Sequence, residues 1–212
     1  FYIWADSLVV GIYLGPHEMG LYRTANQFVT MVYGLLFGPL LPVLYSYFSS
    51  IQHDPERIRE VLFRVIRVIT FIAIPIAFLF YSIAEPLTTA IFGQHWPGIG
   101  SIVGVLALLH GISWIVGANG EAYRAIGKPE LETRIMAFMA IFYAAGYLIS
   151  IRISFEAFLW TRFALALLAM TVHIWTARIA VELRVRRTLG YIGKVALVCA
   201  PVILLSSLYA VA

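Results

Sequence analysis

Apolar residues recur in long blocks along the chain, separated by short polar or turn-forming stretches. Seven blocks can be drawn, with approximate bounds 1–14, 22–48, 62–84, 98–118, 135–151, 157–181 and 191–212. A helix needs roughly 20 apolar residues to cross a bilayer, and most blocks reach or approach that length. Turn signals such as Gly15-Pro16 and Gly127-Lys128-Pro129 lie between blocks. The pattern predicts an all-α, polytopic transmembrane helix bundle.

Composition supports the same class. Hydrophobic residues make up 61% of the chain and charged residues 12%, against about 45–50% and 25% in soluble domains. The single cysteine, Cys199, excludes an intramolecular disulfide and any CxxC-type metal or redox site. The net charge of +4 comes from basic residues that lie between apolar blocks, so no nucleic-acid partner is expected.

The first block is shorter than a membrane span and does not begin with Met. It has no charged leader region or cleavage site that would make it a signal peptide. We therefore expect the sequence to be a fragment whose first helix is truncated, and whose last block begins a further transmembrane helix.

Lysine and arginine gather at alternate ends of the blocks. Twelve of the 15 basic residues lie at the ends that join blocks two and three, four and five, and six and seven. The other three are Arg23, Arg152 and Arg162. Cytoplasmic loops carry the excess of basic residues in membrane proteins, so these three connections are predicted to be cytoplasmic.

A helix start precedes the third block. Asp54 can cap a helix that begins at Pro55, and Ile58, Leu62 and Ile66 then recur at helical spacing opposite basic residues. We interpret this as an amphipathic segment that lies on the cytoplasmic leaflet before the third block. It serves either as a basic lead-in that fixes topology, which we favour, or as a lipid-headgroup sensor or coupling helix.

Motifs for nucleotide hydrolysis and metal catalysis are missing. Gly193-Lys194 lacks the P-loop spacing, and His17-Glu18 has no second histidine at the zincin position. We expect no enzyme activity, no cofactor and no metal.

Two ionisable residues lie at similar depth inside apolar blocks, Asp6 and Arg162. A charge at the bilayer centre costs about 2.5–3.5 kcal/mol or more, so each must face a partner or a hydrated cavity. The two residues form either a structural ion pair or part of a substrate or ion path.

The second block carries a polar patch, Arg23, Asn26 and Gln27, and the fourth carries His110 near mid-depth. These residues are path candidates together with Asp6 and Arg162. The alternatives are a snorkelling Arg23, and side chains that only hydrogen-bond between helices.

Small and rigid residues predict local helix geometry. The pairs Gly34/Gly38 and Gly100/Gly104 are expected to allow close helix packing. Pro39 and Pro75 are expected to interrupt their helices.

Several ordered segments resemble one family. The run from Asp6 to Gly15, DSLVVGIYLG, is followed by MGLYRTA from Met19. Further matches are Pro42 before Ser49–Arg57, Ala84–Trp96, and Asn119 before Tyr123–Pro129. Over most of residues 1–134 the chain resembles the C-terminal half of Wzx-like polysaccharide transporters. These belong to the multidrug/oligosaccharidyl-lipid/polysaccharide flippase superfamily.

The resemblance implies two six-helix bundles around a central cavity. Residues 1–182 would form the second bundle, residues 183–212 a basic cytoplasmic loop and the start of a further helix, and the N-terminal bundle is missing from this chain. Family members move undecaprenyl-pyrophosphate-linked oligosaccharides across the bacterial cytoplasmic membrane for O-antigen, capsule or exopolysaccharide assembly. The implied partners are the lipid bilayer, this lipid-linked glycan, and polymerase and export proteins of the same pathway. Alternatives are a drug or cation antiporter of the same superfamily and a multispanning membrane enzyme of glycan assembly.

Overall fold

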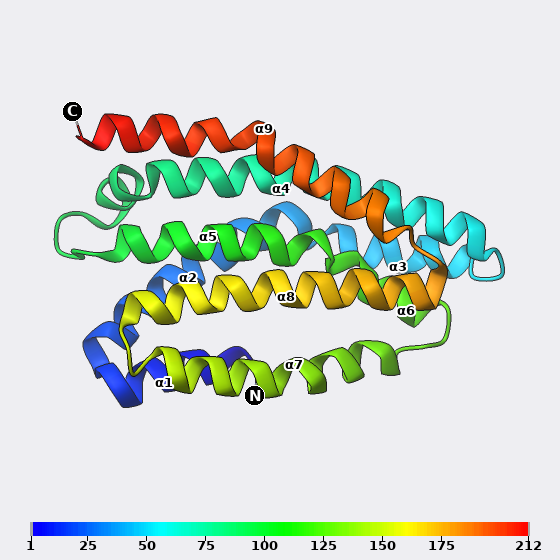
Figure 1. Ribbon diagram of the computed structural model, residues 1–212, viewed down its shortest axis with the longest axis horizontal. Helices are drawn as coiled ribbons and strands as arrows, with labels where there is room; N and C mark the ends of the chain where they lie inside the picture. The colour runs from blue at the N-terminus through cyan, green and yellow to red at the C-terminus, as the bar shows by residue number, and fades with distance from the viewer. Residues whose placement is uncertain (1, 212) are drawn as a thin grey trace.

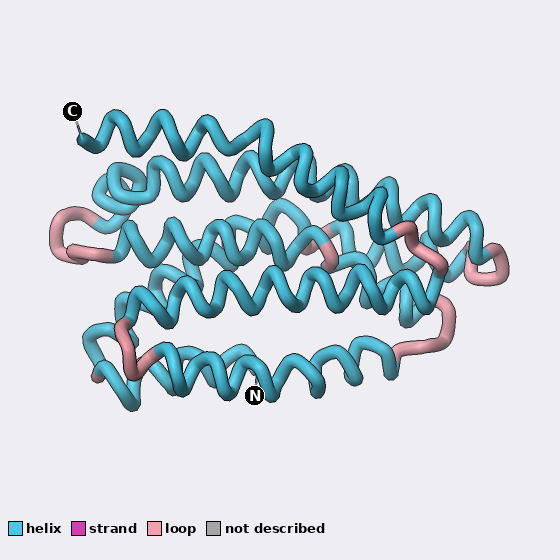
Figure 2. Tube along the Cα trace, viewed as in Figure 1, coloured by secondary structure: helices cyan, strands magenta, loops and turns pink. Residues whose placement is uncertain are grey.

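The computed structural model describes the backbone of residues 2–211 and the side chains of residues 5–203. Over this part of the chain the backbone forms nine α-helices and no strand, as Figure 2 shows. They are α1 (Tyr2–Leu14), α2 (Pro16–Phe37), α3 (Leu40–Ser50), α4 (Pro55–Phe92), α5 (Ile99–Ile115), α6 (Gly117–Ala125), α7 (Glu130–Ser150), α8 (Phe155–Val181) and α9 (Val185–Val211). The prediction of an all-α bundle is confirmed. The outermost residues of the first and last predicted blocks lie outside the described residues.

The helices lie side by side along the longest axis of the molecule (Figure 1). The connections that follow α3, α6 and α8 meet at one end, and those that follow α1, α4 and α7 meet at the other. This is the alternation that the distribution of basic residues predicts. We call the first of these ends the basic end.

Several helices are long and apolar enough to cross a bilayer. Within the described residues these are α4, the run Ile99–Ala125 formed by α5 and α6, α7 and α8. Helices α2 and α3, which bend by 42° where they meet, form a fifth span when the pair is counted as one. Leu35, Phe71, Ile141 and Ile179 expose their side chains on the outside of the bundle, as lipid-facing residues do. The chain is therefore a multi-pass membrane protein.

Helix α5 is the most buried of these spans. In the window of highest hydropathy in Ile99–Ala125, 72% of the residues are buried inside the bundle. A Cβ atom added at Gly104 would lie 3.3 Å from the ring of Tyr81 on α4, so this glycine does permit close packing. A Cβ atom at Gly34 would meet no described atom within 4 Å, so the close packing predicted for Gly34 is not observed among the described residues.

Helix α4 corrects two sequence predictions. It runs unbroken for 38 residues from Pro55, so the predicted amphipathic segment is its first part and not a separate surface helix. Ile58 and Leu62 are fully buried against the protein core, which holds this part upright in the bundle. Pro75 lies inside α4 without ending it, because neighbouring helices can compensate the one hydrogen bond that a proline removes. The predicted cap is confirmed, since Asp54 Oδ1 accepts a hydrogen bond from the Arg57 backbone N–H at 3.0 Å.

Pro39 does mark a break. It lies between α2 and α3, directly after Gly38, at the position of the 42° bend. The proline lacks a backbone N–H, so the regular hydrogen-bond pattern is interrupted there.

Candidate functional site

Asp6 and Arg162 form an ion pair inside the bundle. Arg162 Nη2 lies 2.9 Å from Asp6 Oδ2, and the two side chains are only 12% and 5% exposed. The hydroxyl of Tyr22 donates a second bond to the same carboxylate oxygen at 2.6 Å. The Ser7 backbone N–H donates to Asp6 Oδ1 at 2.7 Å. The carboxylate is thus bonded on both oxygens.

Three helices position the guanidinium group of Arg162. Its Nε donates to the hydroxyl of Tyr147 on α7 at 3.2 Å. Its Cζ lies 5.4 Å from the ring centre of Tyr22 on α2 and 5.9 Å from that of Tyr147. Aromatic faces at these distances attract a cation. The turn at Gly15, where φ is 98°, folds α1 back on α2 and brings Asp6 to Tyr22.

This arrangement neutralises both charges away from lipid and from open solvent. One guanidinium nitrogen, Nη1 of Arg162, is buried and has no hydrogen-bond partner among the described residues. The structural ion pair that the sequence allowed is therefore present. A substrate or ion path through Asp6 and Arg162 stays a prediction.

His110 forms a second polar group in the interior. Its Nε2 lies 3.3 Å from Asn26 Oδ1 and 3.4 Å from Thr30 Oγ1, so it links α5 to α2. Its ring stacks on Tyr33 with centroids 6.1 Å apart. The alternative of a histidine that hydrogen-bonds a neighbouring helix is observed. Sequence reasoning missed Thr30, although it lies four residues after Asn26 and so on the same side of a helix.

The polar patch predicted on α2 is divided between two faces of the helix. Tyr22 and Asn26 contact other helices, whereas Arg23 and Gln27 are exposed. Arg23, Gln27 and Thr30 follow one another at spacings of four and three residues, so they line one exposed stripe. At 1.5 Å per residue from Pro16, this stripe runs from about 10 to about 21 Å along α2. A hydrocarbon core is about 30 Å thick, so the whole stripe lies within one membrane thickness of the start of α2.

A further polar contact lies nearer the basic end. The backbone carbonyl of His173 accepts bonds from Asn119 Nδ2 at 3.2 Å and from the hydroxyl of Tyr123 at 3.0 Å. Asn119 and Tyr123 stand in one of the segments that carry the family resemblance. Periodicity alone did not single out these residues, because both occupy an otherwise buried face of α6.

Comparison with known proteins gives one family match, in the first half of the chain, and several relatives. The sequence profile of a family described as polysaccharide biosynthesis protein matches residues 1–101. The succinoglycan biosynthesis transport protein ExoT of Rhizobium meliloti is 31% identical over 108 residues, which cover 51% of this chain and 22% of that protein.

Two other relatives extend the range of organisms. The teichuronic acid biosynthesis protein TuaB of Bacillus subtilis is 25% identical over 127 residues, 59% of this chain and 26% of that protein. A probable low-salt glycan biosynthesis flippase of Haloferax volcanii is 24% identical over 139 residues, 63% of this chain and 29% of that protein. No solved structure matches.

These matches confirm the predicted similarity to polysaccharide transporters. The chain spans about a fifth to a third of the length of the curated relatives that it matches.

Proposed function

We propose that this chain is part of a transporter that flips lipid-linked oligosaccharides across the cytoplasmic membrane of a bacterium. The names of the relatives support this, because one is a succinoglycan biosynthesis transport protein and another a probable glycan biosynthesis flippase. The substrate would be an undecaprenyl-pyrophosphate-linked repeat unit. Polymerase and export proteins of the same pathway would be its partners. We place the basic end of the bundle in the cytoplasm, following the excess of Lys and Arg there.

One structural observation carries the proposal: the exposed polar stripe of Arg23, Gln27 and Thr30 on α2. Exposed polar side chains at this depth are costly against lipid and are expected to face water or protein. Hydrogen-bonding groups and a cation suit a glycan that is attached to an anionic diphosphate. We infer that this stripe borders the path of the polar head group.

The ion pair argues against the antiporter alternative. A transported cation or proton needs an acidic residue within the membrane. The Asp6 carboxylate, the candidate for that role, is already bonded to Arg162, Tyr22 and Ser7. In the proposed function Asp6 and Arg162 hold α1 against α8, and the protein acts as a transporter and not as an enzyme.

The test uses the complete gene product in a strain that lacks its lipid-linked oligosaccharide flippase. Restored surface glycan, with loss of the lipid-linked repeat unit that accumulates inside, is the expected result. The variant R23Q/Q27L should reduce export about tenfold at equal membrane level. Losing one charge-assisted hydrogen bond costs about 1.5–3 kcal/mol, and 1.4 kcal/mol corresponds to tenfold.

The matched control is L35M, which changes an exposed apolar residue of the same helix and should export normally. Failure of the native protein to restore any glycan export would contradict the proposed function. Normal export by R23Q/Q27L would remove the α2 stripe from the path.

A further inference from the structure

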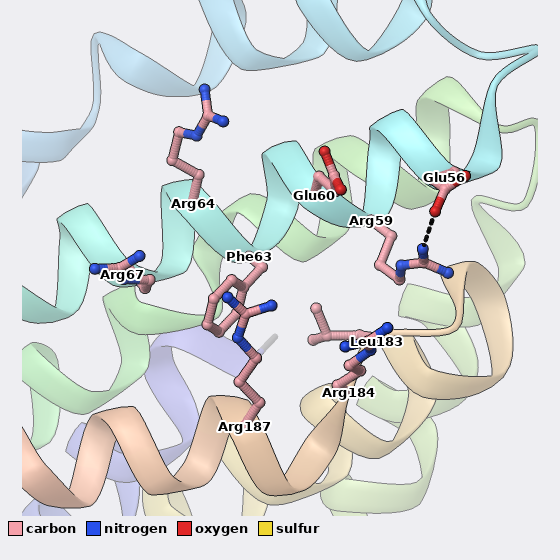
Figure 3. Close-up of a pocket in the computed structure, with 9 residues that line it drawn as sticks. All are labelled: Glu56, Arg59, Glu60, Phe63, Arg64, Arg67, Leu183, Arg184 and Arg187. Atoms are coloured by element: carbon pink, nitrogen blue, oxygen red, sulfur yellow. Dashed lines mark hydrogen bonds and ion pairs between the residues drawn. The ribbon is translucent and has the colours of Figure 1, made fainter.

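A basic cleft lies between the first turns of α4 and the start of α9, and the path proposed above does not use it. It encloses about 300 Å³ (Figure 3). The residues that line it are Glu56, Arg59, Glu60, Phe63, Arg64, Arg67, Leu183, Arg184 and Arg187. A second cavity of about 320 Å³ shares Phe63, Arg67 and Arg187 with it and adds Arg186, Gly190, Tyr191 and Lys194.

Helix geometry accounts for this concentration of charge. On α4 the buried stripe of Ile58, Leu62 and Ile66 faces the core, so the residues between them are left at the surface. Arg184 lies directly before α9 and Arg187 in its first turn, and both meet this surface where α4 and α9 pack. Figure 3 shows Arg59 directed from α4 toward α9, and Arg187 reaching from α9 toward Phe63.

Most of the cationic groups have no acidic partner. Glu56 bonds Arg59 at 2.7 Å, and Glu182 lies 3.4 Å from the same arginine. In the described part of the chain, Arg64, Arg67, Arg184 and Arg187 have no carboxylate oxygen within the 4.0 Å of an ion pair. Glu60 also lines the cleft, and it leaves the cations in excess.

Aromatic rings hold the two shared arginines in place. The Cζ of Arg187 lies 4.4 Å from the ring centre of Phe63, and that of Arg67 lies 5.8 Å from it. Arg67 also lies 5.0 Å from the ring centre of Tyr191. A guanidinium group that stacks on a ring keeps its N–H donors available at the edge. The cleft thus presents ordered donors with no acceptor of their own.

The position of the cleft indicates which anion it takes. With 38 residues, α4 is about 57 Å long, far longer than the hydrocarbon core of about 30 Å. Its first turns therefore lie at the level of the lipid head groups. Further along α4, Val68 and Phe71 are exposed, four and seven residues after Arg64. A charged head group at the cleft and apolar lipid chains along the exposed side of α4 suit these residues.

We propose that the cleft between α4 and α9 binds the phosphate head group of an anionic membrane lipid. Arginine forks bind phosphate oxygens through paired hydrogen bonds. The two adjoining cavities, with Arg67 and Arg187 in both, offer room for a diphosphate as well as a monoester. The site is separate from the α2 stripe and does not require the transport function.

The experiment measures binding of dioctanoyl phosphatidylglycerol to the complete protein in neutral detergent by native mass spectrometry. Dioctanoyl phosphatidylcholine serves as the zwitterionic lipid. The native protein should bind the anionic lipid at least about tenfold more tightly. The variant R67Q/R187Q should lose about tenfold or more in affinity, because two charge-assisted contacts are removed.

The matched control is R57Q/R134Q, which removes the same charge at the basic end but from residues outside both cavities. It should keep its affinity within about twofold. If R67Q/R187Q does not fold, R184Q changes an exposed arginine of the same cleft and should weaken binding in the same direction.

Two competition measurements identify which molecule supplies the phosphate. If farnesyl diphosphate displaces the phospholipid when present at a lower concentration than the phospholipid, a prenyl diphosphate is the preferred lipid. If it does not displace the phospholipid, a phospholipid is preferred. Free inorganic phosphate or pyrophosphate that competes as well as either lipid would overturn the proposal. Equal binding of the two dioctanoyl lipids, or equal losses in R67Q/R187Q and R57Q/R134Q, would overturn it too.

Discussion

At the scale of single residues, the buried charges of the bundle are paired with each other, whereas several polar groups lie on its outside. Asp6 and Arg162 form an ion pair, and two tyrosines hydrogen-bond to it. Arg23 and Gln27 lie on an exposed face instead. The first arrangement fixes the positions of helices, and the second places polar groups on the outside of α2.

We expect D6N and R162Q each to destabilise the protein by about 3–5 kcal/mol, because each leaves an uncompensated charge in the interior. The amount of folded protein in the membrane should fall, and export divided by protein level should remain near normal. Quantitative immunoblotting and thermal unfolding in detergent measure the first effect, and glycan export measures the second.

The charge-swapped double variant D6R/R162D should recover part of the lost protein level. A normal protein level in either single variant, together with a loss of export, would assign these residues to the substrate path and not to helix packing.

The sequence indicated that Asp6 and Arg162 needed partners, because each interrupts an apolar block. It did not indicate Tyr22 and Tyr147, since a tyrosine in a membrane helix is as common at the interface as in the interior. Which side of a helix faces which neighbour depends on how the helices pack, and one sequence with a mostly apolar surface leaves that rotation open. His110 and Thr30 illustrate the point, because their contact joins α5 to α2.

At the scale of helices, each of the seven apolar blocks corresponds to a helix or to two consecutive helices. Blocks two and four are divided, at Gly38-Pro39 and at Val116. The helix before the third block joins it, because its apolar residues have protein to pack against. Hydropathy reports how long a segment is apolar, and it contains little information about where the backbone bends.

Two glycines are predicted to respond differently to replacement by alanine, because Gly111 is closely packed and Gly34 is not. A Cβ atom at Gly111 on α5 would lie 2.6 Å from Ala77 Cβ and 3.1 Å from Tyr33 Oη. G111A should therefore destabilise the protein by about 1–3 kcal/mol through overpacking. Thermal unfolding in detergent measures the loss.

The matched control is G34A on α2, where an added Cβ atom has open space. This variant should be neutral or more stable by up to about 1 kcal/mol, because alanine favours the helix more than glycine does. Equal losses in the two variants would show that α4 and α5 are not closely packed at Gly111.

At the scale of the whole molecule, three connections and most of the basic residues share one end of the bundle. The excess of Lys and Arg at this end predicts that it faces the cytoplasm. The other end carries Arg152 and the loop between α4 and α5.

Cysteines introduced one at a time at Gln94 and Lys128, in a C199A background, test this orientation. Gln94 lies in the connection between α4 and α5, and Lys128 in that between α6 and α7, at the basic end. An impermeant maleimide added outside intact cells should label position 94 and not position 128. Labelling at both should follow permeabilisation, and the reversed pattern in intact cells would place the basic end outside.

The ion pair also has a consequence for how the chain is made. Arg162 is synthesised about 150 residues after Asp6, which at roughly 5–20 residues per second is a delay on the order of ten seconds. During that interval Arg162 is not yet available to the carboxylate of Asp6. Tyr22, only 16 residues away, is available almost at once and donates its short hydrogen bond. The hairpin of α1 and α2 thus provides an early hydrogen-bond partner for the buried carboxylate of Asp6 until Arg162 emerges from the ribosome.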